Sequence, residues 1–307
     1  MKSQTSKIAV ATRNVEFDIA RAIAIFLMIF QHLWLVVLSG FANNPLLDFF
    51  IFLSGTFLVA PVFLFIMGAN IVASRKNKAP QLFVRGLKFL VVGYALSFFK
   101  FFLPLFLLQK FGLIVDLENI IYKIPLLGYL LEFDILQIAG FALITIALLK
   151  KLKIKVDIYL IIAFIVALIS PFLSSFFGTE KYIIFPFFPW IFYPLLGYYF
   201  GNALQKTENK RHFYLDCLRK IIPVFFLGIV FLFFGSEADF SYSHHGTGLC
   251  FLFASIIVAW LAFWALNYQK LKTKTINILT FFSKKVTIIY IVQWLVIAWT
   301  AILLNIK

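Results

Sequence analysis

The chain has 307 residues, of which 63% are hydrophobic, 19% aromatic and only 13% charged. This composition excludes a soluble globular domain and indicates a polytopic membrane protein. A net charge of +15 would suggest nucleic acid as a partner in a soluble protein. Here the positions of the charges explain the excess, and we expect no nucleic-acid partner.

Most basic residues lie in short segments between apolar runs. Of the 28 Lys and Arg residues, 22 fall in five such segments, at the N-terminus and at 75–88, 150–155, 206–220 and 270–285. Cytoplasmic loops of membrane proteins carry this excess of positive charge. The pattern predicts a multi-pass protein of the cell membrane with a cytoplasmic N-terminus. The first apolar run lacks a small-residue cleavage site, so we expect a retained span rather than a signal peptide.

The first span, 16–38, carries one polar stripe. Arg21 and His32 are about three helical turns apart, so they lie on the same face, with Asp18 one turn before Arg21. The standard helical rise places Arg21 about 16 Å from His32 along the axis. The complete stripe reads Asp18, Arg21, Ile25, Met28 and His32.

Two interpretations of this stripe are open. In the first, Arg21 lies at the headgroup level, pairs with Asp18 and sets the topology, while His32 lies in the opposite interface. In the second, the stripe faces a polar cavity inside a bundle, where His32 does chemistry. A charged side chain costs about 2.5–3.5 kcal/mol at a helix centre, and a helix that served only as an anchor would have no reason to carry it.

The remaining apolar runs predict a single all-α domain, 1–307, built as a polytopic membrane helix bundle of about nine to eleven transmembrane helices. We find no internal repeat. A short helix at 275–285 is expected to lie on the membrane surface. The nine clearest spans lie at 16–38, 46–73, 87–108, 126–149, 156–177, 182–204, 221–235, 249–268 and 286–304.

Two of these spans cannot be regular helices. The second is too long for a straight crossing and is interrupted by Gly55 and Pro61, so a tilted, broken or partly re-entrant segment fits it. In the sixth, broken backbone beside Trp190 and Tyr193 indicates a cavity wall, the alternative being an aromatic belt at the interface. Its outer half carries three prolines, Pro186, Pro189 and Pro194.

Polar residues inside the third and fourth spans are candidate functional residues. Lys100 lies in an aromatic run, and we expect its ammonium group to extend to the outer interface. The fourth span contains Glu132, Asp134 and Gln137. Acidic residues within a span are candidates for function, and the alternative is that these lie in the outer headgroup layer.

An outer loop after the seventh span contains His244 and His245. Adjacent His residues are a poor metal-ligand spacing, so we expect no metal and a substrate-facing or solvated loop. Cys217 and Cys250 fall on opposite sides of the membrane in this topology, which argues against a disulfide.

Five stretches together resemble known membrane acyltransferases. The first span, in which Arg21 is followed after ten residues by His32, resembles the first helix of the acyltransferases that decorate bacterial surface sugars, acyltransferase family 3. The other four resemble signatures of heparan-alpha-glucosaminide N-acetyltransferase and its bacterial relatives. They are APVFLFIMGANI (60–71), IPLLGYLLEFDILQIAGFALI (124–144), FPFFPWIFYPLLGYYFG (185–201) and FFSKKVTIIYIVQWLVI (281–297).

The resemblance implies a function in the bacterial inner membrane. It implies an integral-membrane acyltransferase that uses acyl-CoA, with acetyl-CoA as the expected donor, from the cytoplasm. The acyl group would pass to a sugar or glycolipid acceptor at the membrane or on its far side, as in polysaccharide modification. It also implies that His32 is the catalytic residue and that Arg21 is essential.

The side-chain chemistry assigns roles to these residues. His32 serves as the base or as an acyl relay, because neutral imidazole is available near pH 7. Asp18 completes the catalytic stripe. A carboxylate near the other ring nitrogen would orient the imidazole, and Asp48 or Asp134 could supply it, although the sequence does not place them. We expect the donor to be bound by Arg21, Arg75, Lys76 and Arg85. The expected acceptor-binding residues are Asp134, Gln137, Trp190, His244 and His245.

Three alternatives stay open. The first is a transporter or binding protein with an intramembrane path through Asp18, Arg21, Glu132 and Asp134, although such proteins are expected to show repeated halves. The second is a catalytically degenerate relative, because Gln293 stands where the last helix of relatives often has His. The third concerns only the basic loops, which could serve topology and anionic lipid rather than CoA.

Overall fold

The computed structural model describes residues 14–38, 45–47, 58–112, 126–130, 133–176, 187–234 and 242–304, without the side chains of 173–176, 234 and 242–245. This part of the chain is almost entirely helical and contains no β-strand. The predicted all-α class is therefore confirmed. Predictions that concern Asp48, Gly55, Glu132 and Pro186 lie outside the described residues.

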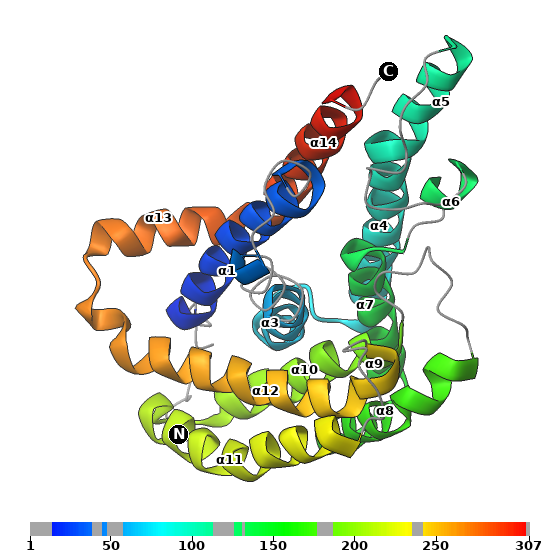
Figure 1. Cartoon of the computed structure of the whole chain (residues 1–307). Helices are drawn as coiled ribbons and strands as arrows, with labels where there is room; N and C mark the ends of the chain where they lie inside the picture. The colour runs from blue at the N-terminus through cyan, green and yellow to red at the C-terminus, as the bar shows by residue number, and fades with distance from the viewer. Residues whose placement is uncertain are drawn as a thin grey trace, which may run out of the picture.

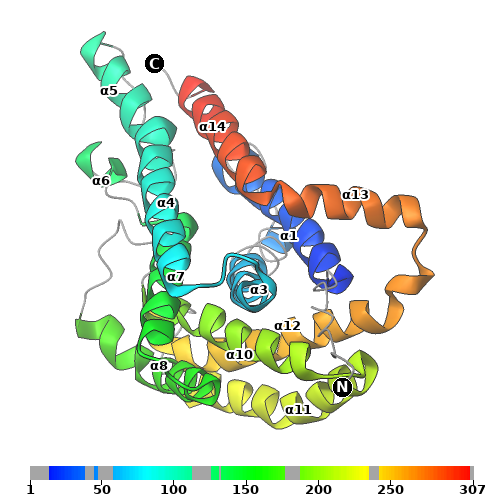
Figure 2. The same cartoon turned by 180° about the vertical axis from the view of Figure 1, so that it is seen from behind.

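The helices form two groups around α3 (Figures 1 and 2). The first flanks α3, with α1, α13 and α14 on one side and α4 and α7 on the other, and the second lies below α3 in the view of Figure 1. α3 spans Ala60–Ala73. In the first group, α1 contacts α14 and α13, and α4 pairs with α7. The bounds are Val15–Leu33 for α1, Ala79–Ser97 for α4, Leu103–Lys110 for α5, Leu126–Leu130 for α6, Ile135–Lys151 for α7, Thr273–Lys284 for α13 and Val286–Leu304 for α14.

In the second group, α10 packs along α3, α11 pairs with α12, and α8 contacts both α10 and α12. The bounds are Val156–Phe176 for α8, Phe187–Trp190 for α9, Phe192–Lys206 for α10, Lys210–Phe234 for α11 and Tyr242–Asn267 for α12.

Four of the described helical segments are long and apolar enough to cross a membrane. Large apolar side chains point outward from this helical framework; Val91, Phe172 and Phe233 are 69%, 72% and 86% exposed. Apolar surface of this kind fits contact with lipid acyl chains. The predicted number of nine to eleven transmembrane helices is not confirmed. The four segments are Val15–Leu38, Ala79–Lys110, Gly246–Lys270 and Val286–Leu304.

Several helix ends differ from the predicted spans for a simple reason. α11 begins at Lys210, well before the predicted start at residue 221, because its basic first turns are helical without being apolar. The fourth predicted span is divided, since α7 begins only at Ile135 after an extended Asp134. The predicted surface helix is confirmed as a helix, α13. Hydropathy identifies stretches that are apolar enough to span a membrane, whereas the residues at which a helix begins and ends depend on local hydrogen bonds.

The irregular backbone predicted for the sixth span is confirmed where the structure describes it. Phe188 has extended dihedrals, φ −98° and ψ 130°, inside the short α9, and α10 begins at Phe192. The Phe188–Pro189 peptide bond is cis. Trp190 is buried in this region, at 2% exposure.

α3 and α10 are in backbone contact through three glycines. A Cβ atom added to Gly68 would overlap the Pro194 carbonyl, and one added to Gly197 would overlap the carbonyl of Phe65. Gly201 meets the backbone of Ala69 in the same way. Small residues allow helices in membranes to approach this closely.

We predict that Gly197→Ala destabilises the protein by about 1–3 kcal/mol, because a rigid carbonyl cannot yield to the added methyl group. Thermal unfolding in detergent measures the effect. Asn202→Ala, at a partly exposed position of the same helix, is the control and should unfold close to the parent's temperature. Equal unfolding temperatures for the Gly197 variant and the parent would contradict this close packing.

Candidate active site

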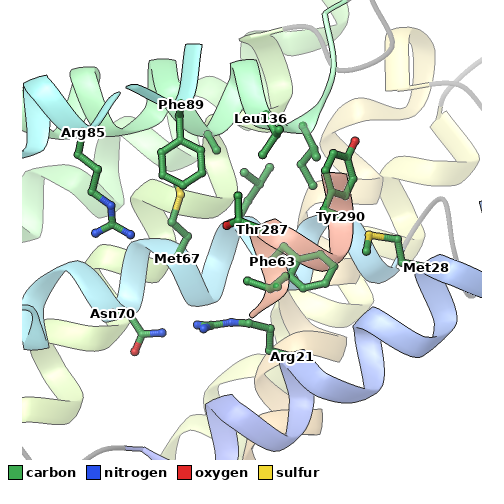
Figure 3. Close-up of a pocket in the computed structure, with 14 residues that line it drawn as sticks. Arg21, Met28, Phe63, Met67, Asn70, Arg85, Phe89, Leu136, Thr287 and Tyr290 are labelled. Atoms are coloured by element: carbon green, nitrogen blue, oxygen red, sulfur yellow. The ribbon is translucent and has the colours of Figure 1, made fainter. Parts of the chain in front are cut away.

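A cavity of ≈ 170 Å³ lies between α1, α3, α4, α7 and α14 (Figure 3). Four of these helices belong to the first group, and the fifth is α3 itself. The second group of helices supports the cavity indirectly, because α10 holds the opposite face of α3. The lining residues are Arg21, Met28, Phe63, Leu64, Met67, Asn70, Arg85, Phe89, Ile135, Leu136, Ala139, Val286, Thr287 and Tyr290.

One end of the cavity is basic. Arg21 of α1, Asn70 of α3 and Arg85 of α4 lie there, with the side chains of Arg21 and Asn70 directed toward each other (Figure 3). Both arginines are partly exposed, so a ligand can reach them. Two planar guanidinium groups around one opening are suited to bind phosphate or another oxyanion.

Arg21 is tied to α13 by a hydroxyl group. Its Nη1 donates to Ser283 Oγ at 3.5 Å, and Ser283 donates in turn to Asp18 Oδ1 at 2.7 Å. Asp18 is buried, at 4% exposure. The buried carboxylate therefore supports the hydroxyl that contacts Arg21. Two residues of the predicted stripe on α1, Arg21 and Met28, line the cavity.

The middle of the cavity is apolar. Its walls are side chains of Phe63, Leu64 and Met67 from α3, with Phe89 and Leu136 opposite. Such walls accept a long, weakly polar chain and offer few hydrogen bonds to it. The cavity thus combines a basic end, suited to an anion, with apolar walls.

A buried ionic cluster lies beyond the far end. Tyr290, which lines the cavity, donates its hydroxyl hydrogen to Asp134 Oδ2 at 2.6 Å. Lys100 Nζ lies 3.5 Å from the same oxygen and 4.2 Å from the centre of the Trp294 ring. The prediction that Lys100 extends to the outer interface is wrong, because the residue is 0% exposed. An ion pair and an aromatic face stabilise its charge inside the protein.

Asp134 is fixed by the start of α7. Its Oδ1 accepts the backbone N–H of Ile135 at 2.7 Å, and its own N–H donates to Gln137 Oε1 at 3.2 Å. Gln137 Nε2 then donates to Ser97 Oγ at 3.4 Å. Asp134 and Gln137, both predicted to bind the acceptor, are thus buried in a helix cap and are not among the residues that line the cavity.

His32 lies next to this cluster and is partly exposed. Its ring centre is 4.2 Å from that of Trp294 and 6.4 Å from that of Tyr290. Its Nδ1 is 3.0 Å from Nε2 of Gln293. No described hydrogen bond joins Asp134 to the imidazole, and the side-chain amide of Gln293 contacts Nδ1 instead. His32 is not a lining residue, but Met28 and Tyr290 bring the cavity toward it.

The other predicted site residues lie elsewhere. Arg75 and Lys76 are exposed in the turn after α3. Trp190 is buried and does not line the cavity. The backbone of His244 and His245 forms the first turn of α12 rather than a loop, and their side chains lie outside the described set. No group of three His, Cys, Asp or Glu side chains with metal-binding geometry occurs in the described part.

Sequence reasoning assigned no site residue to the last helix. Tyr290, Gln293, Trp294 and Ile297 are all buried. Their spacing of three and four residues places them on one face of α14, and three of the four are aromatic or polar. That spacing was a readable signal. Nothing in the sequence indicated that this face meets His32.

Comparison with known proteins gives one decisive result. A family profile described as an acyltransferase domain, that of acyltransferase family 3, matches residues 14–307. The chain belongs to this family. The resemblance inferred from Arg21 and His32 is thereby confirmed. No curated protein and no solved structure matches the chain. Together with its apolar helices, membership makes this a multi-pass membrane protein of an acyltransferase family.

We predict that Lys100→Met destabilises this acyltransferase-family protein by about 3–5 kcal/mol, because it leaves the Asp134 carboxylate buried without its cation. Thermal unfolding in detergent measures the loss. The double variant Lys100→Met/Asp134→Asn removes both charges and keeps an amide that can cap α7, so it should recover most of the stability. Equal losses in the single and double variants would show that the ion pair is not the cause.

Proposed function

We propose that the protein is a membrane acyltransferase that moves an acyl group from acyl-CoA to a sugar or glycolipid acceptor. Acetyl is the acyl group to test first. The single observation that carries this proposal is the cavity, which has Arg21 and Arg85 at one end, apolar side chains in its walls, and Tyr290, a neighbour of His32, among its lining residues. Membership in acyltransferase family 3 supports the reaction class.

The donor matches the cavity group by group. The phosphates of CoA bind at Arg21 and Arg85, where two guanidinium groups face the opening. The pantetheine arm is long, thin and weakly polar, and it follows the apolar walls. Arg21 and His32 are about 16 Å apart along α1, a distance that a pantetheine arm can bridge. The thioester then reaches the end of the cavity at Tyr290.

The positive-inside pattern gives this binding mode a direction. The basic segment 75–88 contains Arg85, and the basic segment 270–285 ends directly before α14. Cytoplasmic loops carry such charge, so the basic opening faces the cytoplasm, where acyl-CoA is made. Arg75 and Lys76 are exposed in the turn after α3, and we assign the phosphate contacts to Arg21 and Arg85 instead.

His32 acts on the acceptor in the transfer step. Its neutral imidazole takes the proton of the acceptor O–H or N–H as that atom bonds to the acyl carbon. The C–S bond breaks, and the imidazolium returns the proton to the sulfur, so that CoA leaves as the thiol. In an acyl relay, the same nitrogen attacks the thioester first, the C–S bond breaks and CoA leaves as the thiolate. The acceptor then takes the acyl group from the imidazole, and its proton goes to the thiolate. Both routes need one ring nitrogen with a free lone pair.

The buried cluster beside His32 supports this step. Lys100 carries a positive charge in a region from which water is largely excluded, and its contact with the Trp294 ring places that charge close to the imidazole. Asp134 pairs with this charge, so the cluster adds no net positive potential, and its part in the step is to hold Trp294 and Tyr290 beside the imidazole. Tyr290 links the cluster to the cavity through its bond to Asp134.

We predict that Arg21→Ala and Arg85→Ala each weaken the binding of acetyl-CoA by about tenfold or more, because each removes a charge-assisted phosphate contact. Isothermal titration of the detergent-purified protein measures the dissociation constants. Arg75→Ala is the matched control, since it removes an exposed arginine outside the cavity, and its affinity should equal that of the parent.

Acetyl-pantetheine, which lacks the nucleotide and its phosphates, provides the second arm of this experiment. Its affinity should be the same for the parent and both cavity variants. An equal loss of acetyl-CoA affinity in Arg75→Ala, or a loss of acetyl-pantetheine affinity in Arg21→Ala, would refute the assignment of the phosphates to the basic opening.

We predict that His32→Ala abolishes acyl transfer and leaves acetyl-CoA affinity within about twofold of the parent, because the imidazole acts on the acceptor rather than on the nucleotide. Transfer from radiolabelled acetyl-CoA to membrane glycolipid measures the activity. A His32→Ala protein that transfers acetyl at the parental rate would rule out this residue as base or relay.

A further inference from the structure

The last helix contributes the one described side-chain contact to a nitrogen of His32. Gln293 Nε2 lies 3.0 Å from Nδ1 of the imidazole, a distance typical of a hydrogen bond. Gln293 is 7% exposed, so water offers little competition. α1 and α14 are in direct contact, and this contact therefore links helices from opposite ends of the chain.

The neighbours of His32 hold the ring in one plane. The Trp294 ring lies 4.2 Å from it at an interplanar angle of 36°, and Tyr290 presents its edge at 72°. Trp294 is itself held by the ammonium group of Lys100, 4.2 Å from its ring centre. The imidazole is thus confined by aromatic contacts, while Gln293 controls one of its nitrogens.

The orientation of this amide decides which imidazole nitrogen is available. In neutral imidazole, one nitrogen carries the proton and the other has the free lone pair. In the structure, the Gln293 N–H group faces Nδ1, and Oε1 is buried without a hydrogen-bond partner among the described residues. A half-turn about the last side-chain bond of Gln293 brings its Oε1 to Nδ1 of His32. There Oε1 accepts the ring N–H, and Nε2 of the imidazole keeps its free lone pair.

The nearby carboxylate is committed to other groups. Asp134 Oδ1 accepts the N–H of Ile135, and Oδ2 holds both Tyr290 and Lys100. Gln293 therefore takes the orienting position that a carboxylate fills in a Ser-His-Asp triad and an amide fills in a Cys-His-Asn triad. An amide orients the ring without adding a charge next to the ion pair.

We propose that Gln293 is the positioning residue for His32: its Oε1 accepts the Nδ1 proton and leaves Nε2 as the nitrogen that meets the substrate. This inference rests on the proposed function, because a free Nε2 is needed by a base or an acyl relay. It assigns to an uncharged residue of the last helix the selection of the imidazole tautomer.

Two substitutions of similar length test the kinetic part. Gln293→Met removes both ends of the amide, so the tautomer is no longer selected, and kcat should fall about 100-fold or more, while KM for acetyl-CoA changes less than about twofold. Gln293→Glu keeps an oxygen acceptor and should restore kcat to within about tenfold of the parent. A Gln293→Met enzyme with the parental kcat would overturn the proposal.

A spectroscopic measurement tests the tautomer without any need for activity. The parent, labelled with ¹⁵N-histidine in detergent, should show the His32 proton on Nδ1, and His32→Ala identifies the signals. In Gln293→Met both tautomers should be populated, whereas Gln293→Glu should keep the Nδ1 form. A parent spectrum with the proton on Nε2 would overturn the proposal, because the remaining nitrogen would then be a donor rather than a base.

The two proposals fail in different ways. If the parent bound no acetyl-CoA or other acyl-CoA by isothermal titration and transferred no label, the proposed function would fail. The NMR result would still report on Gln293 and His32 by itself. If the parent were active and the Gln293 variants kept its kcat and its spectrum, the positioning role alone would fail.

Discussion

A charge pair buried in a membrane protein constrains the rest of the site. An isolated Lys or Asp side chain is costly in a low-dielectric interior, so Lys100 and Asp134 must remain together. Each also fixes another part of the site, because Asp134 begins α7 and holds Tyr290, while Lys100 holds Trp294 against His32. The π-helical segment Phe98–Phe102, which follows α4 and carries Lys100, thereby shares one network with α7, α14 and α1.

The wall of the cavity depends on a second constraint, which is steric rather than electrostatic. α3 presents Phe63, Met67 and Asn70 to the cavity, and its position is set from behind by glycine contacts with α10. At these contacts the backbones of α3 and α10 touch, so neither helix can move closer to the other. The second group of helices therefore positions the cavity although none of its residues lines it.

The sequence was informative about the first helix and less so about its partners. The period of the α-helix placed Arg21, Met28 and His32 on one face, and the apolar runs predicted most of the helices. The burial of Lys100 could not be predicted, because its partner is 34 residues away in the chain and hydropathy cannot identify an ion pair. The contact between His32 and Gln293 spans 261 residues and depends on how α1 packs against α14. Such pairs follow from tertiary packing, which periodicity does not encode.

The cavity wall contains two of the few methionines of the chain. The chain has 41 Phe but only three Met residues, and the two that follow Met1, Met28 and Met67, both line this cavity. A thioether chain is unbranched and polarisable, so it can change rotamer to fit ligands of different shapes at little cost. The same sulfur atoms are open to oxidation, which would turn an apolar wall into a polar one. The part of the cavity wall that holds Met28 and Met67 can therefore adapt to a ligand, and it is also open to oxidation by peroxide.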